Sequence, residues 1–292
     1  AARGEGVAWF VGWNLALEYM MSAATVAVGW SGYVVNLLEE FGLHLPAALV
    51  NAPVGKNAEH TLVATGAIVN LPAVLIVVAL TWLCYIGIRQ SASLNNLMVV
   101  IKVAIIVLFI VVGVSFVDTS LWQPYLPANT GEFGHFGLSG VMQGAAIIYF
   151  AYIGFDTAAT TAQEARNPQR DVPAGIMGAL VISTILYVAM GAVMTGMVDY
   201  TRLDVAAPVA VALDEHPSLR WLGLPVKIGA IIGMTSVILM SILGQPRIFM
   251  AMARDGLLPP QLEKVHPRYH TPSVATIITG VIAAIFAGVF PI

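Results

Sequence analysis

Three ionisable residues stand inside long apolar runs of the sequence, where a charge is costly and usually marks a function or a buried pair. Glu18 lies in the first such run, Lys102 in the third and Asp156 in the fourth. Lys102 is about 10 Å into its run, which is deep for a lysine that reaches back to the membrane surface. A desolvated lysine can release and regain a proton near neutral pH, so Lys102 is a candidate for a functional proton-binding group.

Each of the three residues has a simpler interpretation as well. Lys102 can be a static partner of Glu18 or of a backbone carbonyl group. Glu18 is a candidate for substrate specificity or for such a buried pair. Asp156 lies closer to the end of its run, where it can cap a helix segment or bind its loop neighbours.

The run that contains Asp156 is also the place where a helix is least expected to be continuous. Residues 150–155 surround Gly154 with aromatic and β-branched side chains, and Asp156 and Thr157 follow directly. A span interrupted by glycine indicates a broken helix whose free backbone groups face a substrate. A half-helix that begins near Asp156 would present N–H groups and a positive dipole end.

The composition indicates which solvent surrounds these elements. Hydrophobic residues make up 58% of the 292 residues and charged residues 10%, against about 45–50% and about 25% in soluble domains. The mean hydropathy is +0.84. So few charges cannot cover the water-facing surface of a soluble protein, so lipid must surround much of the chain. Neither a metal site nor a nucleic-acid site is expected, and the single cysteine, Cys84, has no internal disulfide partner.

Seven apolar segments are long enough to cross a bilayer, which takes roughly 20 residues. The predicted spans are 7–37, 61–87, 95–117, 138–162, 173–198, 226–253 and 273–290. Because open strands cannot cross a bilayer, we expect an all-α polytopic membrane protein that forms one transmembrane domain over residues 1–292.

The basic residues between the spans and near their ends are unequally divided between the two sides. Eight lie on the side of the N-terminus, namely Arg3, Arg89, Arg166, Arg170, Arg247, Arg254, Lys264 and Arg268. Four lie on the other side, namely Lys56, Arg202, Arg220 and Lys227. Because cytoplasmic loops are enriched in lysine and arginine, the N-terminus is predicted to be cytoplasmic.

Two kinds of function are alternatives for such a helical bundle. An intramembrane hydrolase is suggested by Gly29-Trp30-Ser31-Gly32, which resembles the serine motif of rhomboid-like proteases. Such a serine needs a histidine base within hydrogen-bond reach, and all six histidines fall outside the predicted spans. A structural membrane module that transports nothing is the other alternative, and it would be indifferent to the loss of Lys102. We therefore do not expect an enzyme.

Several stretches in colinear order resemble the amino acid–polyamine–organocation superfamily, and most closely its bacterial cationic amino acid transporter family. They are Gly12-Trp13-Asn14-Leu15 with Glu18-Tyr19, residues 28–33, Asn95-Asn96 with Lys102, residues 150–156 with 163–173, and residues 244–247 with 253–259. The resemblance covers nearly the whole chain. It implies a proton-coupled permease for cationic or small neutral amino acids in the cytoplasmic membrane, with protons as the coupling ion and no other cofactor.

The resemblance also implies a fold and a site. The family fold has two inverted five-helix repeats and two further helices, of which the seven spans would be the third to the ninth. Phe150, Ala151, Tyr152, Ile153 and Gly154 would then line the substrate site, with Phe150 as a gate. Lys102 would occupy the place where sodium-coupled relatives bind their ion, faced by Thr235 and Ser236, and would therefore be the residue for proton coupling. Since the first two and the last helices of the fold are missing, we expect this piece not to transport alone.

Overall fold

The computed structural model describes residues 4–56, 62–87, 91–152, 154, 167–203, 205 and 208–290, without the side chains of Lys56, residues 91–95 and Phe150. The sequence predicts one transmembrane domain, and this stays a prediction. Contacts within the chain form two compact units. Unit 1 consists of Ala1–Lys102 and Lys227–Ile292, and unit 2 of Val103–Val226. Each unit is described by itself.

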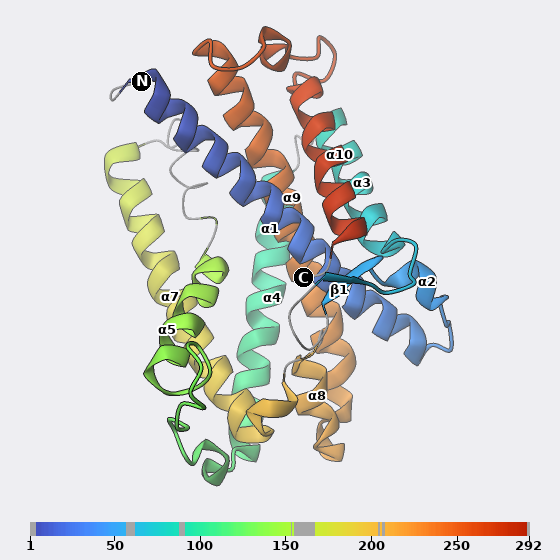
Figure 1. Cartoon of the computed structure of the whole chain (residues 1–292), viewed down its shortest axis with the longest axis vertical. Helices are drawn as coiled ribbons and strands as arrows, with labels where there is room; N and C mark the ends of the chain where they lie inside the picture. The colour runs from blue at the N-terminus through green and yellow to red at the C-terminus, as the bar shows by residue number, and fades with distance from the viewer. Residues whose placement is uncertain are drawn as a thin grey trace. The chain divides into compact units, whose positions relative to one another are not determined.

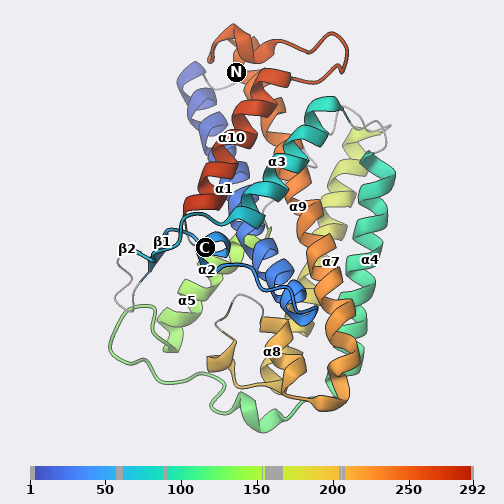
Figure 2. The same ribbon diagram turned by 90° about the vertical axis from the view of Figure 1, so that its right-hand side faces the viewer.

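Unit 1 contains a packed group of three helices, α1 (Glu5–Glu40), α3 (Leu71–Ile86) and α10 (Ser273–Val289). These helices lie side by side in Figures 1 and 2. Small side chains fill the contact, among them Ala23, Ala27, Ala73, Ala283 and Ala287, which are all buried. Small residues let helix backbones approach closely in lipid, so this part of the sequence favours tight helix packing.

The first part of α4 (Ser91–Gly113) and most of α9 (Arg220–Arg254) also belong to unit 1. Three side-chain contacts join α1 to α9 at successive levels: Glu40 with Lys227, Trp30 with Thr235, and Ser22 with Ser241. The residue numbers fall along α9 as they rise along α1. The two helices are therefore antiparallel.

The segment between α1 and α3 differs from the expected helical span 61–87. It contains α2 (Ala47–Val50) and a small antiparallel hairpin of β1 (Val54–Lys56) and β2 (Leu62–Ala64), and α3 begins only at Leu71. Asn70 sets this start, because its side chain accepts a hydrogen bond from the Ala73 N–H at 3.3 Å. Apolar composition alone did not distinguish the β-branched hairpin residues from a helix.

Unit 2 begins in α4 and continues through short 3-10 helices at Val114–Phe116 and Thr119–Trp122 to α5 (Gly137–Ile148), followed by a 3-10 turn at Tyr149–Tyr152. Its other elements are α7 (Pro168–Met197), α8 (Pro208–Asp214), short 3-10 helices at Tyr200–Arg202 and Pro217–Leu219, and the start of α9. Its core is apolar and includes Phe109, Val193, Met197, Leu213 and Leu222.

Helix length and hydropathy agree with a membrane protein. The stretches Glu5–Glu40, Asn96–Phe116, Pro168–Met197 and Pro217–Arg254 are long and apolar enough to cross a bilayer, and the apolar helices α3, α5 and α10 are shorter. Within the described residues, four long and three shorter apolar helices overlap the seven predicted spans. The predicted fold class, an all-α polytopic membrane protein, is confirmed.

Candidate functional site

Lys102 lies half-buried in unit 1, beside α9. Its Nζ donates to Ser236 Oγ at 3.5 Å, and Ser236 Oγ donates to the Gly233 carbonyl at 2.7 Å. A Cβ atom placed on Gly233 would lie 3.5 Å from both Cβ and Cδ of Lys102. The lysine stem therefore runs along the backbone of α9, and its ammonium group reaches the hydroxyl that the sequence predicted to face it.

Thr235 lies next to Ser236 and is held by a contact that the sequence did not reveal. Trp30 Nε1 donates to Thr235 Oγ1 at 2.9 Å, and Thr235 Oγ1 donates to the Ile231 carbonyl at 2.7 Å. The hydroxyl groups of Thr235 and Ser236 thus each donate their proton to a backbone carbonyl of α9. A hydroxyl oxygen has two acceptor lone pairs, so among the described residues each oxygen keeps one acceptor beyond these contacts. We call Thr235 and Ser236 the hydroxyl wall.

Glu18 lies on the same helix as Trp30 but far from its level. Twelve residues separate the two positions, or roughly 18 Å along a helix. Glu18 is half-buried and takes part in an interaction within the chain. Trp30 contacts the hydroxyl wall, and so does Lys102. Glu18 is a long way along α1 from this level, so it does not lie beside Lys102.

The span that contains Gly154 is interrupted, as the sequence indicates. The α-helix α5 ends at Ile148, residues Tyr149–Tyr152 form one 3-10 turn, and Gly154 has φ of 119°. This φ lies in a region that favours glycine because it has no Cβ. Within the described residues, α5 therefore does not continue as an α-helix beyond Ile148.

Two side chains of α7 hold the interrupted segment, and the sequence gave no signal for them beyond their polar type. Tyr187 Oη donates to the Ala151 carbonyl at 2.9 Å, and the hydroxyls of Tyr152 and Thr184 share a hydrogen bond of 2.9 Å. The rings of Tyr152 and Tyr187 meet edge to face with centroids 5.4 Å apart. The segment is thus tied to α7 through its backbone and through one side chain.

The hydrogen bond from Tyr187 to the Ala151 carbonyl can be tested with Tyr187→Phe, which removes only a hydroxyl group. Loss of one such hydrogen bond costs about 0.5–1.5 kcal/mol. We expect Tyr187→Phe in the complete protein to lower substrate affinity by about threefold to tenfold while the melting temperature changes little. Isothermal titration calorimetry and a thermal melt measure the two effects. An affinity equal to wild type would show that this tie does not position the segment.

Other predicted site residues lie outside the described residues. Ile153 and Asp156 belong to them, and so does the side chain of Phe150, although its backbone lies in the 3-10 turn. Their predicted roles stay predictions.

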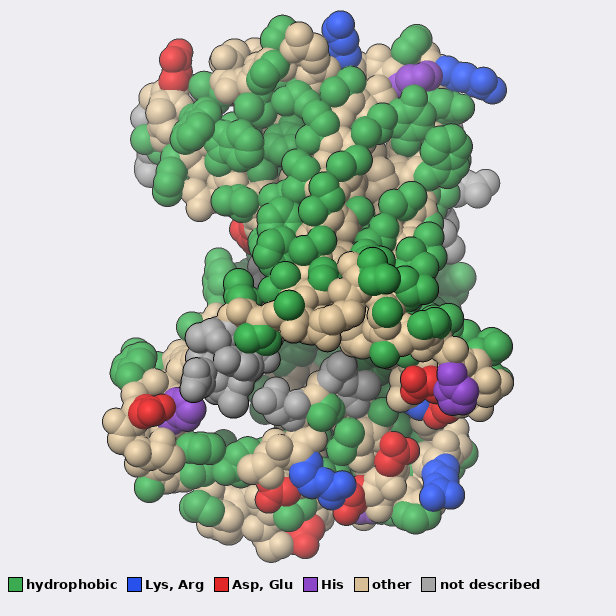
Figure 3. Space-filling view, turned by 45° about the vertical axis from the view of Figure 1, so that its right-hand side comes forward, with side chains coloured by type: hydrophobic (Ala, Val, Ile, Leu, Met, Phe, Trp, Pro, Cys, Tyr) green, Lys and Arg blue, Asp and Glu red, His purple; other side chains and the backbone are tan. Residues whose placement is uncertain are grey.

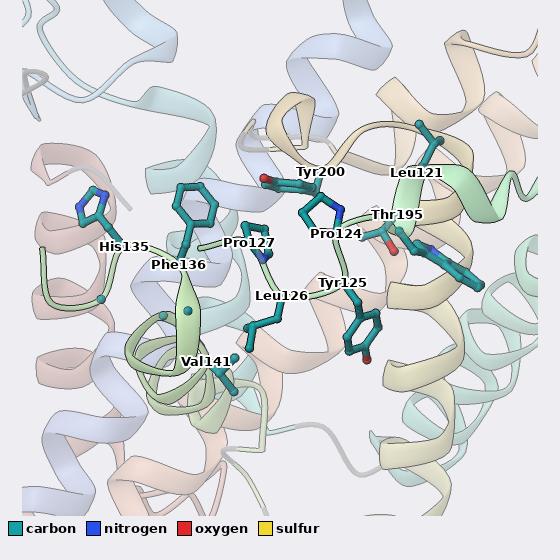
Figure 4. A pocket seen from close by; sticks show the side chains of 14 residues that line it. Leu121, Pro124, Tyr125, Leu126, Pro127, His135, Phe136, Val141, Thr195 and Tyr200 are labelled. Atoms are coloured by element: carbon teal, nitrogen blue, oxygen red, sulfur yellow. The ribbon is translucent and has the colours of Figure 1, made fainter. Parts of the chain in front are cut away.

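Unit 2 also contains an open cavity of about 490 Å³ that no predicted site residue lines. Figure 4 shows Tyr125, Leu126, Pro127, Phe136 and Tyr200 around it. The neighbouring Asp199 carboxylate has a lowered pKa because the Thr201 hydroxyl and backbone N–H both donate to it. α5 begins at this cavity and runs 12 residues to Ile148, or about 18 Å. The cavity therefore lies at the end of α5 that is remote from the interruption.

Ser31, the serine of the protease-like motif, has a structural partner. Its Oγ donates to Asn70 Oδ1 at 2.6 Å, and both side chains are buried. Asn70 is the residue that caps α3. Ser31 therefore joins α1 to the start of α3, which agrees with a packing role.

Comparison with known proteins gives the family. All residues 1–292 match the amino acid permease family. The branched-chain amino acid permease of Bacillus subtilis is 41% identical over 293 residues, which is 100% of this chain and 60% of that protein. The methylthioribose transporter of the same organism is 43% identical, over 98% of this chain and 58% of that protein.

A plant relative is similar over the same region. The vacuolar cationic amino acid transporter 4 of Arabidopsis thaliana is 39% identical over 97% of this chain and 45% of its own length. The chain thus spans about half the length of the curated relatives that it matches. Since the family match covers its whole length, the chain belongs to the amino acid permease family.

Proposed function

We propose that this chain is the central part of a proton-coupled permease that carries cationic or small neutral amino acids across the cell membrane by alternating access. The observation that carries the proposal is the contact of Lys102 with the hydroxyl wall inside an apolar bundle. Two relatives are named as amino acid carriers and one as a methylthioribose transporter. The complete cycle is assigned to the complete protein, since the chain spans only part of those relatives.

Lys102 is proposed as the group that takes up and releases the coupling proton. In the charged form, its ammonium group donates to Ser236. Loss of the proton to water leaves a neutral amine, and the hydroxyl wall then no longer faces a cation. We propose that the contact of Lys102 with α9 changes with the protonation of the lysine, and that this change supplies the two-state element that coupling requires.

The interrupted segment is proposed to hold the amino group of the substrate. The C-terminal end of a helix carries a partial negative charge that favours cations, and α5 ends at Ile148 directly before the segment. The Ala151 carbonyl accepts from Tyr187 and keeps a second lone pair for an ammonium group. Phe150, Tyr152, Ile153 and Gly154 complete the proposed lining.

The chain is proposed to lie with its N-terminus in the cytoplasm. The loops that carry Arg254, Lys264 and Arg268 then face the cytoplasm, as the excess of basic residues on that side supports. Glu18 and Asp156 are proposed to influence specificity or to form buried pairs.

The proposed gate gives a test of the substrate site. Phe150→Ala in the complete protein is expected to weaken amino-acid binding by about tenfold or more, since removal of a stacked aromatic contact costs about 0.5–1.5 kcal/mol beyond its buried area. Binding is measured after a thermal-shift screen of the twenty amino acids has identified the substrate. Equal loss of thermal stability with unchanged affinity would make Phe150 a packing residue.

A further inference from the structure

A long apolar groove runs along the surface of unit 1 between α3 and α10. It encloses about 820 Å³, and its walls include Val78, Trp82, Val281 and Ile285. These four side chains are exposed, Trp82 to 64% and Val281 to 53%. Figure 3 shows hydrophobic side chains over the face that carries α3 and α10, with basic and histidine side chains at its upper end.

The groove exists because the two helices touch at its floor. A Cβ on Gly280 would overlap the side chain of Thr81, and a Cβ on Gly288 would lie 2.7 Å from Val74 Cγ2. The glycines therefore bring the backbones together, and the larger residues of both helices stand to either side. From Ile277 to Val289 the groove extends about 18 Å along α10. One leaflet of a hydrocarbon core of about 30 Å is about 15 Å deep, so the groove has the length of one acyl chain.

One end of the groove is built from aromatic rings. Tyr85 and Tyr269 both line the groove, and their ring centroids lie 5.8 Å apart. His266 stacks on Tyr269 at 4.8 Å, and Trp82 stacks on Tyr85 at 6.0 Å. Aromatic side chains of this kind gather at the depth of lipid headgroups, so this end marks the membrane surface.

Arg268 brings a positive charge to the aromatic end. The guanidinium carbon of Arg268 is 5.5 Å from the centre of the Tyr269 ring. Glu263, the acid of the same loop, pairs with Arg254 at 3.5 Å, and no carboxylate in the described ranges lies within 4.0 Å of Arg268. His266 Nδ1 accepts from the backbone N–H groups of Arg268 and Tyr269, so its ring is held in place under the same turn.

We propose that the groove binds an anionic phospholipid, with one acyl chain between α3 and α10 and the phosphate group at Arg268. An apolar helix of another protein would need no cation at this end, whereas the charge of Arg268 complements a phosphate. Basic groups at the mouth of a cleft between membrane helices bind anionic headgroups. The Thr271 hydroxyl, which donates to the Tyr85 carbonyl at 2.8 Å, fixes the loop that presents Arg268.

Native mass spectrometry of the complete protein with equal amounts of phosphatidylglycerol and phosphatidylcholine tests the proposal. We expect the wild type to retain phosphatidylglycerol about fivefold more than phosphatidylcholine, which corresponds to about 1 kcal/mol for one basic residue at the surface. Arg268→Ala is expected to lower this ratio to about one. Lys264→Ala removes the same charge from the same loop without contact to Tyr269, and is expected to keep the ratio.

The apolar part of the site has its own variants. Val281→Trp fills the groove and is expected to reduce retention of both lipids. Leu75 is an exposed position of α3 that does not line the groove. Leu75→Trp is therefore expected to leave the retention of both lipids unchanged. Equal ratios in the wild type, Arg268→Ala and Lys264→Ala would overturn the proposal. The proposal would also be overturned if the protein were a dimer and Val281→Trp disrupted the dimer without changing the lipid adducts. A second copy of the chain would then occupy the groove. Substrate transport is not the readout, so the outcome is independent of the proposed function.

Discussion

Lys102→Ala in the complete permease is expected to abolish the effect of a pH gradient on amino-acid uptake. The proposed coupling site would then hold no titrating group. The coupling free energy between proton binding and substrate binding would therefore be lost. Such coupling energies are typically about 1–3 kcal/mol, or about 5- to 150-fold in affinity. Uptake into proteoliposomes at several imposed pH gradients measures the change. Undiminished, still pH-driven uptake would show that Lys102 is not the coupling residue.

Two control variants separate coupling from general damage. Lys102→Arg keeps the positive charge but cannot lose it in the physiological range, so uptake is expected to become insensitive to pH. Lys227→Ala removes another buried lysine of unit 1, the one paired with Glu40. It is expected to lower the melting temperature while the pH dependence of uptake remains. Loss of the pH dependence in Lys227→Ala would mean that the assay reports stability instead of coupling.

Gly154→Ala is expected to have the second large effect, because Gly154 has φ of 119°. A side chain in such a sparsely populated backbone region costs about 1–3 kcal/mol. Within the described part of the chain no atom lies within 4 Å of a Cβ at this position, so the cost arises from the backbone and not from a clash. We expect the variant either to lose substrate binding, as the interrupted segment changes its path, or to lose thermal stability by that amount.

Gly144→Ala is the matched control for Gly154→Ala. Gly144 lies in the regular part of α5, and a Cβ there also meets open space. Alanine is favoured over glycine in a helix by roughly 0.5–1 kcal/mol, so this variant is expected to be as stable as the wild type or more stable. If Gly154→Ala behaves like Gly144→Ala in both binding and melting, the conformation of Gly154 has no role in the site.

The sequence was sufficient for the features that depend on composition and spacing. Lipid as solvent, the helical fold class, and the interruption near Gly154 follow from apolar run lengths and from one glycine among aromatic residues. The contact of Lys102 with Ser236 was expected from family resemblance, because the two residues are 134 positions apart. Apolar periodicity alone contains no information on which helices meet.

Other features depend on tertiary contacts that no local pattern reveals. Trp30 orients Thr235 from 205 positions away, and Tyr187 binds the Ala151 carbonyl from 36 positions away. The start of α3 was misplaced because the hairpin residues before Asn70 are as apolar as a membrane helix. A capping asparagine followed by Pro72 was the signal in the sequence that marks this start.

Simultaneous measurement of proton and amino-acid movement tests the proposed function most directly. Proteoliposomes that contain the complete protein and an internal pH indicator start without any pH gradient, and the identified amino acid is added outside. Proton-coupled transport predicts acidification of the lumen in step with amino-acid entry, with no acidification by Lys102→Ala. Amino-acid entry by the wild-type protein without any change in internal pH would contradict the assignment of protons as the coupling ion and of Lys102 as the residue that carries them.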